Sequence, residues 1–407
     1  MKIILLVSIL SLVTACKDQV GTQIGADGSA IVGGNSAVET CATDSTSPIM
    51  GAITSVSSNA SSTVSTTVKW DTASDNCSIK SYELMIGTTP GGSDILAATN
   101  IGDVTEYTAS GLSLSYTTNY YTSVKAIDSL GNKSSMVTSS SWTVFDPRTL
   151  TDLMTWLDSA QIASIKDNAG NTPNQTGFGG DIQTWSDMSG STTAHDYTAV
   201  SGNRPDWDYT EKAVVFNGSN DLTTTPNSGE INIGLVAQRT IQTVIKTSND
   251  INSRQVIFEE GGGTRGLNIY IFQGELYCGF WNATNDGDGT QAFVSSKTTI
   301  SQDTKYVVTM LFDYSNYAGA SGVDGQIECF VDGASIGTNT TTSRLFSHSG
   351  AIGLGGMNNS SRFETGTSSG NGHYYKGHIY EFLMYNTAHS DSSIEKLTNF
   401  HKNKWSL

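Results

Sequence analysis

Positive charge is scarce in this chain. Among its 407 residues, 22 are Lys or Arg and 38 are Asp or Glu, so the formal net charge at pH 7 is −16. A chain with this balance repels the phosphates of nucleic acids and the headgroups of anionic lipids. Charged residues of both signs amount to only 15% of the sequence, while Gly, Ser, Thr and Asn are abundant. The composition argues against nucleic-acid binding and is typical of an extracellular β protein.

A long apolar run is missing even at the N-terminus, where the run from Ile3 to Val13 is too short to span a bilayer comfortably. It follows the positively charged Lys2 and precedes small residues, which is the pattern of a secretory signal. The last four residues of Leu12-Val13-Thr14-Ala15-Cys16 resemble the bacterial lipobox. The resemblance implies cleavage before Cys16 and a diacylglycerol on its sulfur. The alternatives are a transmembrane anchor and an ordinary signal peptide.

Residues 1–15 are therefore predicted to be a lipoprotein signal peptide, and residues 16–40 a flexible tether. The stretch from Lys17 to Glu39 has many small residues and no aromatic one, so it cannot bury enough apolar surface to fold alone. Lys17 follows the lipidated Cys16, at the position where enteric bacteria use Asp to retain a lipoprotein in the inner membrane. The resemblance thus implies a lipid-anchored protein of the bacterial cell envelope and favours the outer membrane.

Residues 41–146 show short alternating strands separated by turns. The expected strands run from Thr67 to Trp70, from Tyr82 to Ile86 and from Tyr120 to Ile127, and such strands with frequent turns indicate a sandwich. Trp70 is expected to fill the core of this sandwich rather than to bind a ligand. The residues that resemble a fibronectin type III or related Ig-like module are Trp70, the turn Asp75-Asn76-Cys77 before Tyr82, Gly111-Leu112, the stretch from Tyr120 to Ala126, Asp128 and Gly131-Asn132.

Residues 149–407 are predicted to form one large all-β domain, because Asp146-Pro147-Arg148 marks a boundary before it. The turn from Val331 to Ala334 is a hairpin signal, and the segment from Ser392 to Glu395 matches a capping box that opens a C-terminal helix. The expected strands are Ala213 to Phe216, Thr240 to Lys246, Gln255 to Phe258, Leu267 to Phe272, Leu276 to Trp281, Lys305 to Phe312, Gln326 to Val331, Ala351 to Leu354 and His378 to Tyr385.

This second domain resembles the bacterial LamG-like, concanavalin A-like jelly rolls. The matching segments, in order, are Trp156-Leu157-Asp158, Trp185 to Gly190, Arg204-Pro205, Val214 to Gly218, Val331-Asp332-Gly333, Ile352 to Gly355, Tyr375 to Phe382, Tyr385-Asn386 and Lys404-Trp405. The resemblance implies two antiparallel sheets packed face to face. The expected fold is thus all-β, an Ig-like β-sandwich followed by a larger concanavalin A-like jelly-roll sandwich with a short C-terminal helix.

The cysteines indicate two disulfides. The chain has five, and removing the lipidated Cys16 leaves Cys41, Cys77, Cys278 and Cys329, an even number in an exported protein. Four cysteines allow three connectivities, and the domain layout favours Cys41–Cys77 and Cys278–Cys329, each inside one domain. Metal binding by these cysteines is the rival interpretation, but the sequence has neither a CxxC pair nor a histidine near them.

Catalytic motifs are largely missing. Glucanases of this fold need a Glu-x-Asp-x-x-Glu strand motif, which the sequence lacks. The adjacent Glu259 and Glu260 point to opposite faces of a strand, and Glu381 is expected to be a buried structural acid with a hydrogen-bond partner. The GxSxG string from Gly366 to Gly370 is expected to lie in a mobile loop, without the strand and helix of a nucleophile elbow. We therefore expect no enzyme; the alternative is a carbohydrate-active hydrolase whose acid pair comes from different strands.

Calcium is the ion that this sequence favours. Asp286 and Asp288 lie in a glycine-rich turn and offer hard oxygen ligands. LamG-like domains often hold calcium at a sheet rim, so the resemblance supports a site here. The alternative is a polar turn without an ion.

Sugar binding requires exposed aromatic rings beside polar hydrogen-bonding groups, and the alternative for each such ring is ordinary packing at the rim of a sheet. The residues that fit this description are Trp207, Tyr209, Trp281, Asn282, Tyr314, Tyr317 and Tyr374. The sequence thus predicts a surface lipoprotein whose head recognises an extracellular glycan or cell-surface ligand, in adhesion or recognition. A structural envelope protein that binds a protein partner is a further alternative.

Overall fold

The computed structural model describes residues 41–56, 65–116, 118–200, 202–224, 231–285, 289–315, 325–348 and 352–407. The predicted signal peptide and tether, with Cys16, lie outside the described residues, as do Asp286, Asp288 and Tyr317. Across the described ranges, no helix has the length and apolar character that a membrane span requires.

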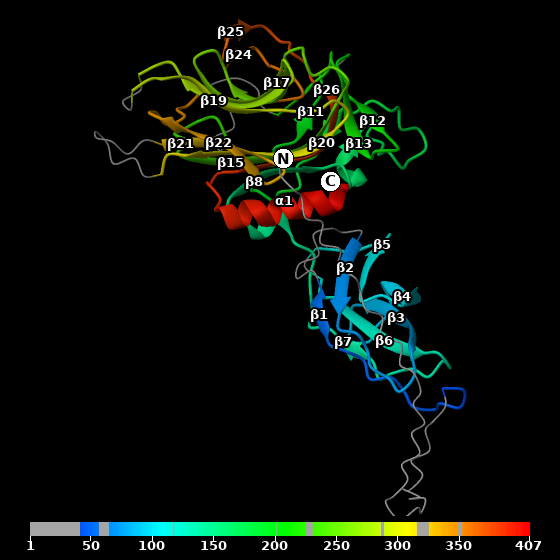
Figure 1. The fold of residues 1–407 in the computed structure, drawn as a ribbon. Helices are drawn as coiled ribbons and strands as arrows, with labels where there is room; N and C mark the ends of the chain where they lie inside the picture. The colour runs from blue at the N-terminus through cyan, green and yellow to red at the C-terminus, as the bar shows by residue number, and fades with distance from the viewer. Residues whose placement is uncertain are drawn as a thin grey trace, which may run out of the picture.

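The described chain is almost entirely β and folds as two sandwiches, a first module and a larger head (Figure 1). The first module pairs its strands in a three-stranded sheet, in the order β1-β2-β5, and a four-stranded sheet, in the order β4-β3-β6-β7. This is the expected Ig-like sandwich. Its strands are β1 (Ile53–Val56), β2 (Ser65–Trp70), β3 (Ile79–Gly87), β4 (Leu96–Gly102), β5 (Glu106–Ser110), β6 (Tyr121–Asp128) and β7 (Val137–Thr138).

Aromatic residues fill the core of the first module. Trp70 is buried and packs against Tyr82 with 5.4 Å between ring centroids, so its predicted core role is confirmed. The hydroxyl of Tyr120, just before β6, accepts a 2.7 Å hydrogen bond from the backbone N–H of Ser115. A tyrosine that bonds back to the preceding loop is a recurring corner of Ig-like sandwiches. The predicted Cys41–Cys77 disulfide is present, with 5.6 Å between the Cα atoms.

The head contains two large sheets, which we call the helix-side sheet and the far sheet. In the helix-side sheet the order is β12-β13-β26-β15-β20-β21-β22, and β8 (Leu153–Asp158) also pairs with β26. Its other strands are β12 (Asp206–Asp208), β13 (Ala213–Asn217), β15 (Gln238–Thr247), β20 (Lys305–Asp313), β21 (Gly325–Val331), β22 (Ala334–Thr341) and β26 (Lys376–Tyr385). The hairpin predicted at Val331 to Ala334 is confirmed, because β21 and β22 pair across Asp332 and Gly333, both with positive φ.

The far sheet has the order β19-β18-β17-β16-β23-β14-β11-β10-β9. Its strands are β9 (Ile165–Lys166), β10 (Thr184–Trp185), β11 (Tyr197–Thr198), β14 (Leu222–Thr224), β16 (Gln255–Gly261), β17 (Arg265–Phe272), β18 (Glu275–Asn282), β19 (Gln291–Thr299) and β23 (Ile352–Leu354). A separate hairpin pairs β24 (Ser360–Phe363) with β25 (Gly366–Ser369). The segment from Gly366 is thus a strand, and its assignment to a loop was wrong.

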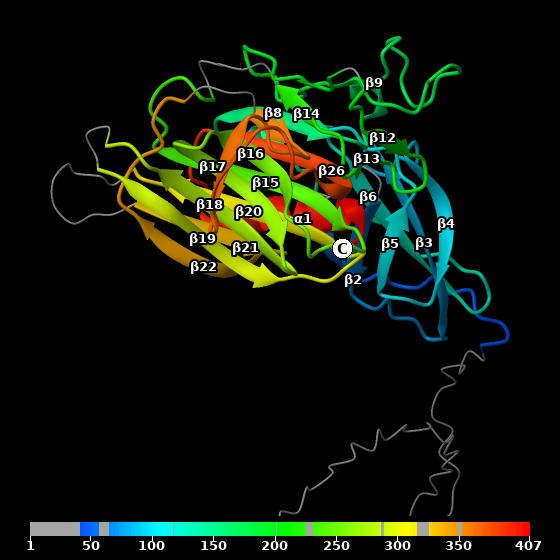
Figure 2. The same ribbon diagram turned by 90° about the horizontal axis from the view of Figure 1, so that it is seen from above.

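The core of the head lies between the two sheets. Rings from opposite sheets meet there, with centroid distances of 5.3 Å for Phe258 and Phe382 and 4.7 Å for Phe280 and Phe312. The second predicted disulfide is also present and crosses this core, because Cys278 lies on β18 and Cys329 on β21 with 6.0 Å between their Cα atoms. Figure 2 shows the strands β16–β19 lying over β20–β22, with α1 beneath both layers.

The predicted C-terminal helix is α1 (Asp391–Trp405). Its N-cap is Ser390, two residues before the expected one, and no side chain caps the first turn. The capping box placed at Ser392 to Glu395 was therefore wrong, since these residues already lie inside the helix. The buried face of α1 includes the expected Leu397 and Phe400, as the helical period requires.

The helix α1 lies between the helix-side sheet and the first module (Figure 1). Phe400 of α1 approaches Phe145 at 5.6 Å and Tyr116 at 6.4 Å between centroids. Tyr116 in turn meets Trp156 of β8 edge-on at 5.3 Å. The first module and the head thus share one apolar cluster, in which Trp156 and Phe400 are fully buried.

Candidate functional site

The aromatic residues chosen as sugar-binding candidates do not gather in one place. Trp207 lies on β12, at an edge of the helix-side sheet, whereas Trp281 lies on β18 of the far sheet. Trp207, Trp281 and Tyr314 are buried, so the expectation that their rings are exposed was wrong. Tyr209 is 61% exposed beside β12, and Tyr374 is half-buried.

Glycines explain why two of these rings are buried. The Trp281 indole lies across Gly266 of the neighbouring strand, where an added Cβ would come within 2.5 Å of the ring. Its Nε1–H donates to the Gly262 carbonyl oxygen at 2.8 Å. Tyr314 lies in the same way across Gly325. A glycine opposite an aromatic residue leaves space that the ring fills, and strand pairing, not local sequence, creates these pairs.

Asn282 is also buried, and its side-chain amide donates to the Ser343 hydroxyl. Its expected role as a ligand contact is therefore replaced by a structural one, because the amide lies inside the head. Within the described ranges, Tyr209 and Tyr374 remain as the accessible members of the predicted set.

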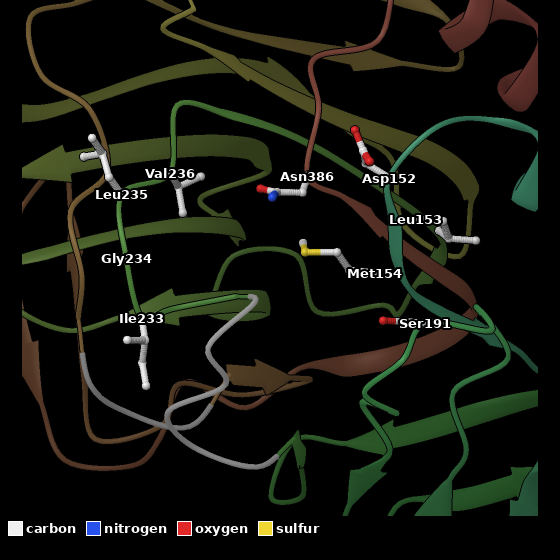
Figure 3. Close-up of a pocket in the computed structure, with 9 residues that line it drawn as sticks. All are labelled: Asp152, Leu153, Met154, Ser191, Ile233, Gly234, Leu235, Val236 and Asn386. Atoms are coloured by element: carbon white, nitrogen blue, oxygen red, sulfur yellow. The ribbon is translucent and has the colours of Figure 1, made fainter.

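A cavity of about 330 Å³ opens at one end of the head, where β8 begins and β26 ends. We call it the rim pocket. One wall is formed by residues 152–154 and Asn386, the other by residues 233–236, and Ser191 lies at one side. Figure 3 shows the side chains of Asn386 and Met154 extending from the first wall toward the segment around Gly234. The volume is at the lower end of the range for ligand pockets.

Backbone hydrogen bonds hold the two walls in place. The N–H of Asn386 donates to the Asp152 carbonyl oxygen at 2.9 Å, and Val236 exchanges backbone hydrogen bonds with Leu345. Asp152 adopts a φ of +63°, a conformation that Asp and Asn tolerate better than most residues. Such a left-handed residue at a cavity is a feature that functional sites often retain.

A buried arginine supports the floor of the rim pocket. Arg239 of β15 is fully buried. Its Nη2 donates to the Ile231 carbonyl oxygen at 2.8 Å and lies 3.5 Å from the Glu260 carboxylate. Its Nη1 contacts the Met154 sulfur at 3.3 Å and donates to the Asn386 Oδ1 at 3.4 Å. Because a buried guanidinium needs partners on several sides, this arginine orients the side chains above it.

The loop that carries Ser191 is fixed to β8 by Asp187. The Asp187 carboxylate accepts hydrogen bonds from the backbone N–H groups of Trp156 at 2.8 Å and His195 at 3.0 Å. The His195 ring contacts the Met154 carbonyl oxygen at 3.0 Å. These contacts bring Ser191 to the side of the pocket, although it is distant in sequence from both walls.

The outer lip of the rim pocket is apolar. Ile233 is 50% exposed and Leu235 is 46% exposed. The pocket therefore joins an apolar lip to the polar groups of Asp152, Ser191 and Asn386. This combination suits a ligand that has both C–H faces and hydroxyl groups.

A second polar cluster lies under α1, around Glu381. Its Oε1 accepts from Trp156 Nε1 at 2.7 Å, and its Oε2 accepts from Lys404 Nζ and Trp405 Nε1, both at 2.8 Å. The Lys404 Nζ atom also lies 2.7 Å from Asp158 Oδ2. The predicted role of Glu381 as a buried, hydrogen-bonded acid is confirmed.

Burial and ion pairing shift the two acids of this cluster in opposite directions. Burial raises the pKa of Asp158 to about 6, despite the neighbouring Lys404. Burial alone would also raise the pKa of Glu381, but Lys404 and His401 together hold that pKa below its ordinary value. Both carboxylates are fully buried, so this pair cannot meet a substrate as glycosidase acids must.

The other catalytic candidates are equally incomplete. Glu260 faces Arg239 inside the head, whereas the Glu259 carboxylate lies beside the backbone of Asn358, so the two acids diverge as predicted. The Ser368 hydroxyl lies 3.1 Å from His373 Nε2. Within the residues that the structure describes, no carboxylate forms an ion pair or hydrogen bond with that histidine, so the orienting third group of a nucleophile triad is missing.

One further acidic group appears in the described ranges, formed by Asp44, Asp75 and Cys77 in the first module. The Cys77 sulfur belongs to a disulfide, so it is no free ligand, and two carboxylates alone are a poor match to calcium. Asp286 and Asp288, the predicted calcium ligands, lie outside the described residues.

Sequence reasoning missed the rim pocket and the partners of Glu381. Lys404 and His401 could have been found, because they continue the helical spacing of Leu397 and Phe400 on the buried face of α1. The residues of the rim pocket carry no comparable signal, since its walls come from distant parts of the chain.

No protein family and no curated protein matches this chain. Solved structures with a similar fold include the binding domain of botulinum neurotoxin serotype D, with 11% sequence identity, 61% of this chain and 51% of that chain covered, and a TM-score of 0.39. The receptor-binding domain of botulinum neurotoxin type G has 10% identity, coverages of 62% and 52%, and a TM-score of 0.40.

The chain thus spans about half the length of the structures it matches. The likeness is too distant to support an argument about function.

Proposed function

We propose that this chain is an envelope lipoprotein whose head binds a glycan in the rim pocket without turning it over. The observation that carries the proposal is the convergence of Asp152, Ser191 and Asn386 on a cavity with an exposed apolar lip. Sugars offer hydroxyl groups at their edges and C–H groups on their faces, so polar side chains beside aliphatic ones are suited to them.

Binding without turnover is supported by the state of the acids. Glu259 and Glu260 diverge, and Asp158 and Glu381 are sealed beneath α1. In the part of the rim-pocket lining that the structure describes, Asp152 is the one carboxylate. Glycoside hydrolysis ordinarily needs two carboxyl groups flanking the scissile bond, so the rim pocket is better suited to recognition.

The lipid anchor at Cys16 and the calcium ion at Asp286 and Asp288 belong to the proposal as well. Their support is the lipobox resemblance and the oxygen-rich turn in the sequence. Together these features favour a head that is displayed at the cell surface by a lipid and presented to extracellular glycans.

A glycan array tests the proposal. The purified full chain is applied with and without Ca²⁺, beside the variants Asn386→Ala and Tyr209→Ala. We expect binding that Asn386→Ala lowers at least about tenfold, as loss of a central hydrogen-bonding contact does, with the melting temperature nearly unchanged. Tyr209→Ala is the matched control, because Tyr209 is exposed on another part of the head.

Two outcomes would overturn the proposal. Loss of binding in Tyr209→Ala but not in Asn386→Ala would place the site beside β12. Release of soluble sugar from an incubated polysaccharide would establish a hydrolase instead.

A further inference from the structure

The charge of the rim pocket bears on which glycan it accepts. Among the described residues that line the cavity, Asp152 is the one that carries a charge. The nearest guanidinium, on Arg239, is fully buried beneath the floor and is already engaged by Asn386, Ile231 and Glu260. An anionic ligand would therefore meet a carboxylate and, among the described lining residues, no cation, in a chain whose net charge is −16.

The side chain of Asn386 has a defined orientation. Its Oδ1 accepts from Arg239 Nη1 at 3.4 Å, which leaves the Nδ2–H₂ group as a donor. Among the described residues no acceptor is bonded to this Nδ2. Arg239 is thus a positioning residue, because it determines which end of the amide faces a ligand.

Asp152 supplies the matching acceptor. Its backbone lies next to that of Asn386, since the Asn386 N–H donates to the Asp152 carbonyl oxygen at 2.9 Å, and both residues line the cavity. A carboxylate only accepts hydrogen bonds at neutral pH, and an amide nitrogen only donates them. An acceptor and a donor that line one cavity can engage hydroxyl groups of the same sugar, one hydroxyl donating and another accepting.

We propose that the rim pocket binds a neutral or amine-bearing sugar through its hydroxyl groups and discriminates against sialylated and sulfated sugars. This inference rests on the glycan-binding function proposed above. The discrimination comes from Asp152, and the recognition of hydroxyl groups comes from Asp152 and Asn386 together. The apolar lip of Ile233 and Leu235 contacts the C–H face of the ring.

Two substitutions separate these roles. Asp152→Asn removes the negative charge but keeps a residue that tolerates the φ of +63°. Asn386→Asp removes the Nδ2 donor while keeping an oxygen for Arg239, so the support beneath the pocket stays in place. Thermal unfolding of both variants checks that the fold is retained.

The experiment compares the purified full chain and both variants on one immobilised set of neutral, amine-bearing, sialylated and sulfated glycans. We expect the unmodified chain to bind the neutral or amine-bearing members at least about tenfold more tightly than acidic members with the same core. Asp152→Asn should reduce the difference in affinity between neutral and acidic glycans to about threefold or less, chiefly because the acidic glycans bind more tightly to this variant. Asn386→Asp should weaken binding of the neutral members by about tenfold or more, at an unchanged melting temperature.

The outcomes distinguish this inference from the proposed function. Binding that needs Asn386 but favours sialylated or sulfated glycans would overturn the charge discrimination and leave the glycan-binding function standing. An unchanged preference in Asp152→Asn would likewise overturn the inference. Absence of binding to every glycan in the set would overturn the proposed function, and the inference with it.

Discussion

Lys404 joins the two buried carboxylates of Asp158 and Glu381 beneath α1. Its Nζ atom lies 2.7 Å from Asp158 Oδ2 and 2.8 Å from Glu381 Oε2. All three side chains are buried. Charges in such a place are tolerated only when they are paired and hydrogen-bonded. A single residue near the C-terminus thus connects α1 to β8 and β26 at once.

We expect Lys404→Met to lower the free energy of unfolding by about 3 kcal/mol or more, because Asp158 loses its buried cation and Glu381 keeps only His401 as an ion-pair partner among the described residues. Urea denaturation measures the change. Lys402→Met is the matched control on the same helix, since Lys402 makes only a 3.5 Å contact with the Asp332 carbonyl oxygen, and its effect should stay within about 0.5 kcal/mol. Equal effects of the two variants would contradict the assigned role of Lys404.

Asp221 makes the stability of the head depend on pH. Burial raises the pKa of this carboxyl to about 6, compared with 3.8 in an unfolded chain. The folded state therefore holds the proton more tightly than the unfolded state does. The resulting stabilisation is present below pH 3.8 and is lost as the pH rises to about 6.

Asp221→Asn should accordingly make the protein more stable at pH 7, by about 2 kcal/mol, and leave its stability at pH 3.5 nearly unchanged. Chemical denaturation at the two pH values measures both quantities. An Asn variant that is less stable at pH 7 would show that the carboxylate has a stabilising partner instead.

At the scale of elements, the disulfide Cys278–Cys329 joins β18 of the far sheet to β21 of the helix-side sheet. Its two cysteines are 51 residues apart in sequence, so the bond closes a long loop across the core. Cross-links of this kind act chiefly by reducing the entropy of the unfolded chain. They also hold the two sheets of the sandwich in one register.

Replacing Cys278 and Cys329 together by Ala should lower the free energy of unfolding by about 4 kcal/mol, the value expected for a loop of this length. Denaturation curves of the double variant and of the unmodified protein measure the difference. Peptide mapping after thiol alkylation is the independent check, and labelled Cys278 or Cys329 in the unmodified protein would contradict the pairing.

At the scale of the whole molecule, α1 makes the first module and the head share a core. Phe400 contacts Tyr116 and Phe145 of the first module, while Tyr116 also meets Trp156 of the head. Shared aromatic packing limits the relative motion expected of two modules joined by a linker alone. The first module is thus suited to hold the head at a defined distance and orientation from its attachment point.

The attachment point itself is predicted to be the lipid on Cys16. Cys16→Ser should block lipidation and move the protein from the membrane fraction to the soluble fraction, because a signal peptide without the acceptor sulfur is no longer processed as a lipoprotein. Fractionation followed by immunoblotting measures the distribution. A Cys16→Ser protein that is still found in the membrane fraction would contradict the lipid anchor.

The sequence alone determined the all-β fold, the division into two sandwiches, both disulfide pairs, the terminal helix and the buried state of Glu381. The strands, turns and terminal helix are encoded by alternation, turn composition and spacing, which neighbouring residues carry. The disulfide pairs follow from the division of the four cysteines between the two domains. The tertiary structure alone decided which aromatic rings are exposed and where the pocket lies. Trp281 is buried because a glycine of another strand lies beneath it, and Asp152 meets Asn386 because β8 and β26 pair. Contacts between residues distant in the chain determine such features, and no local pattern in the sequence records them.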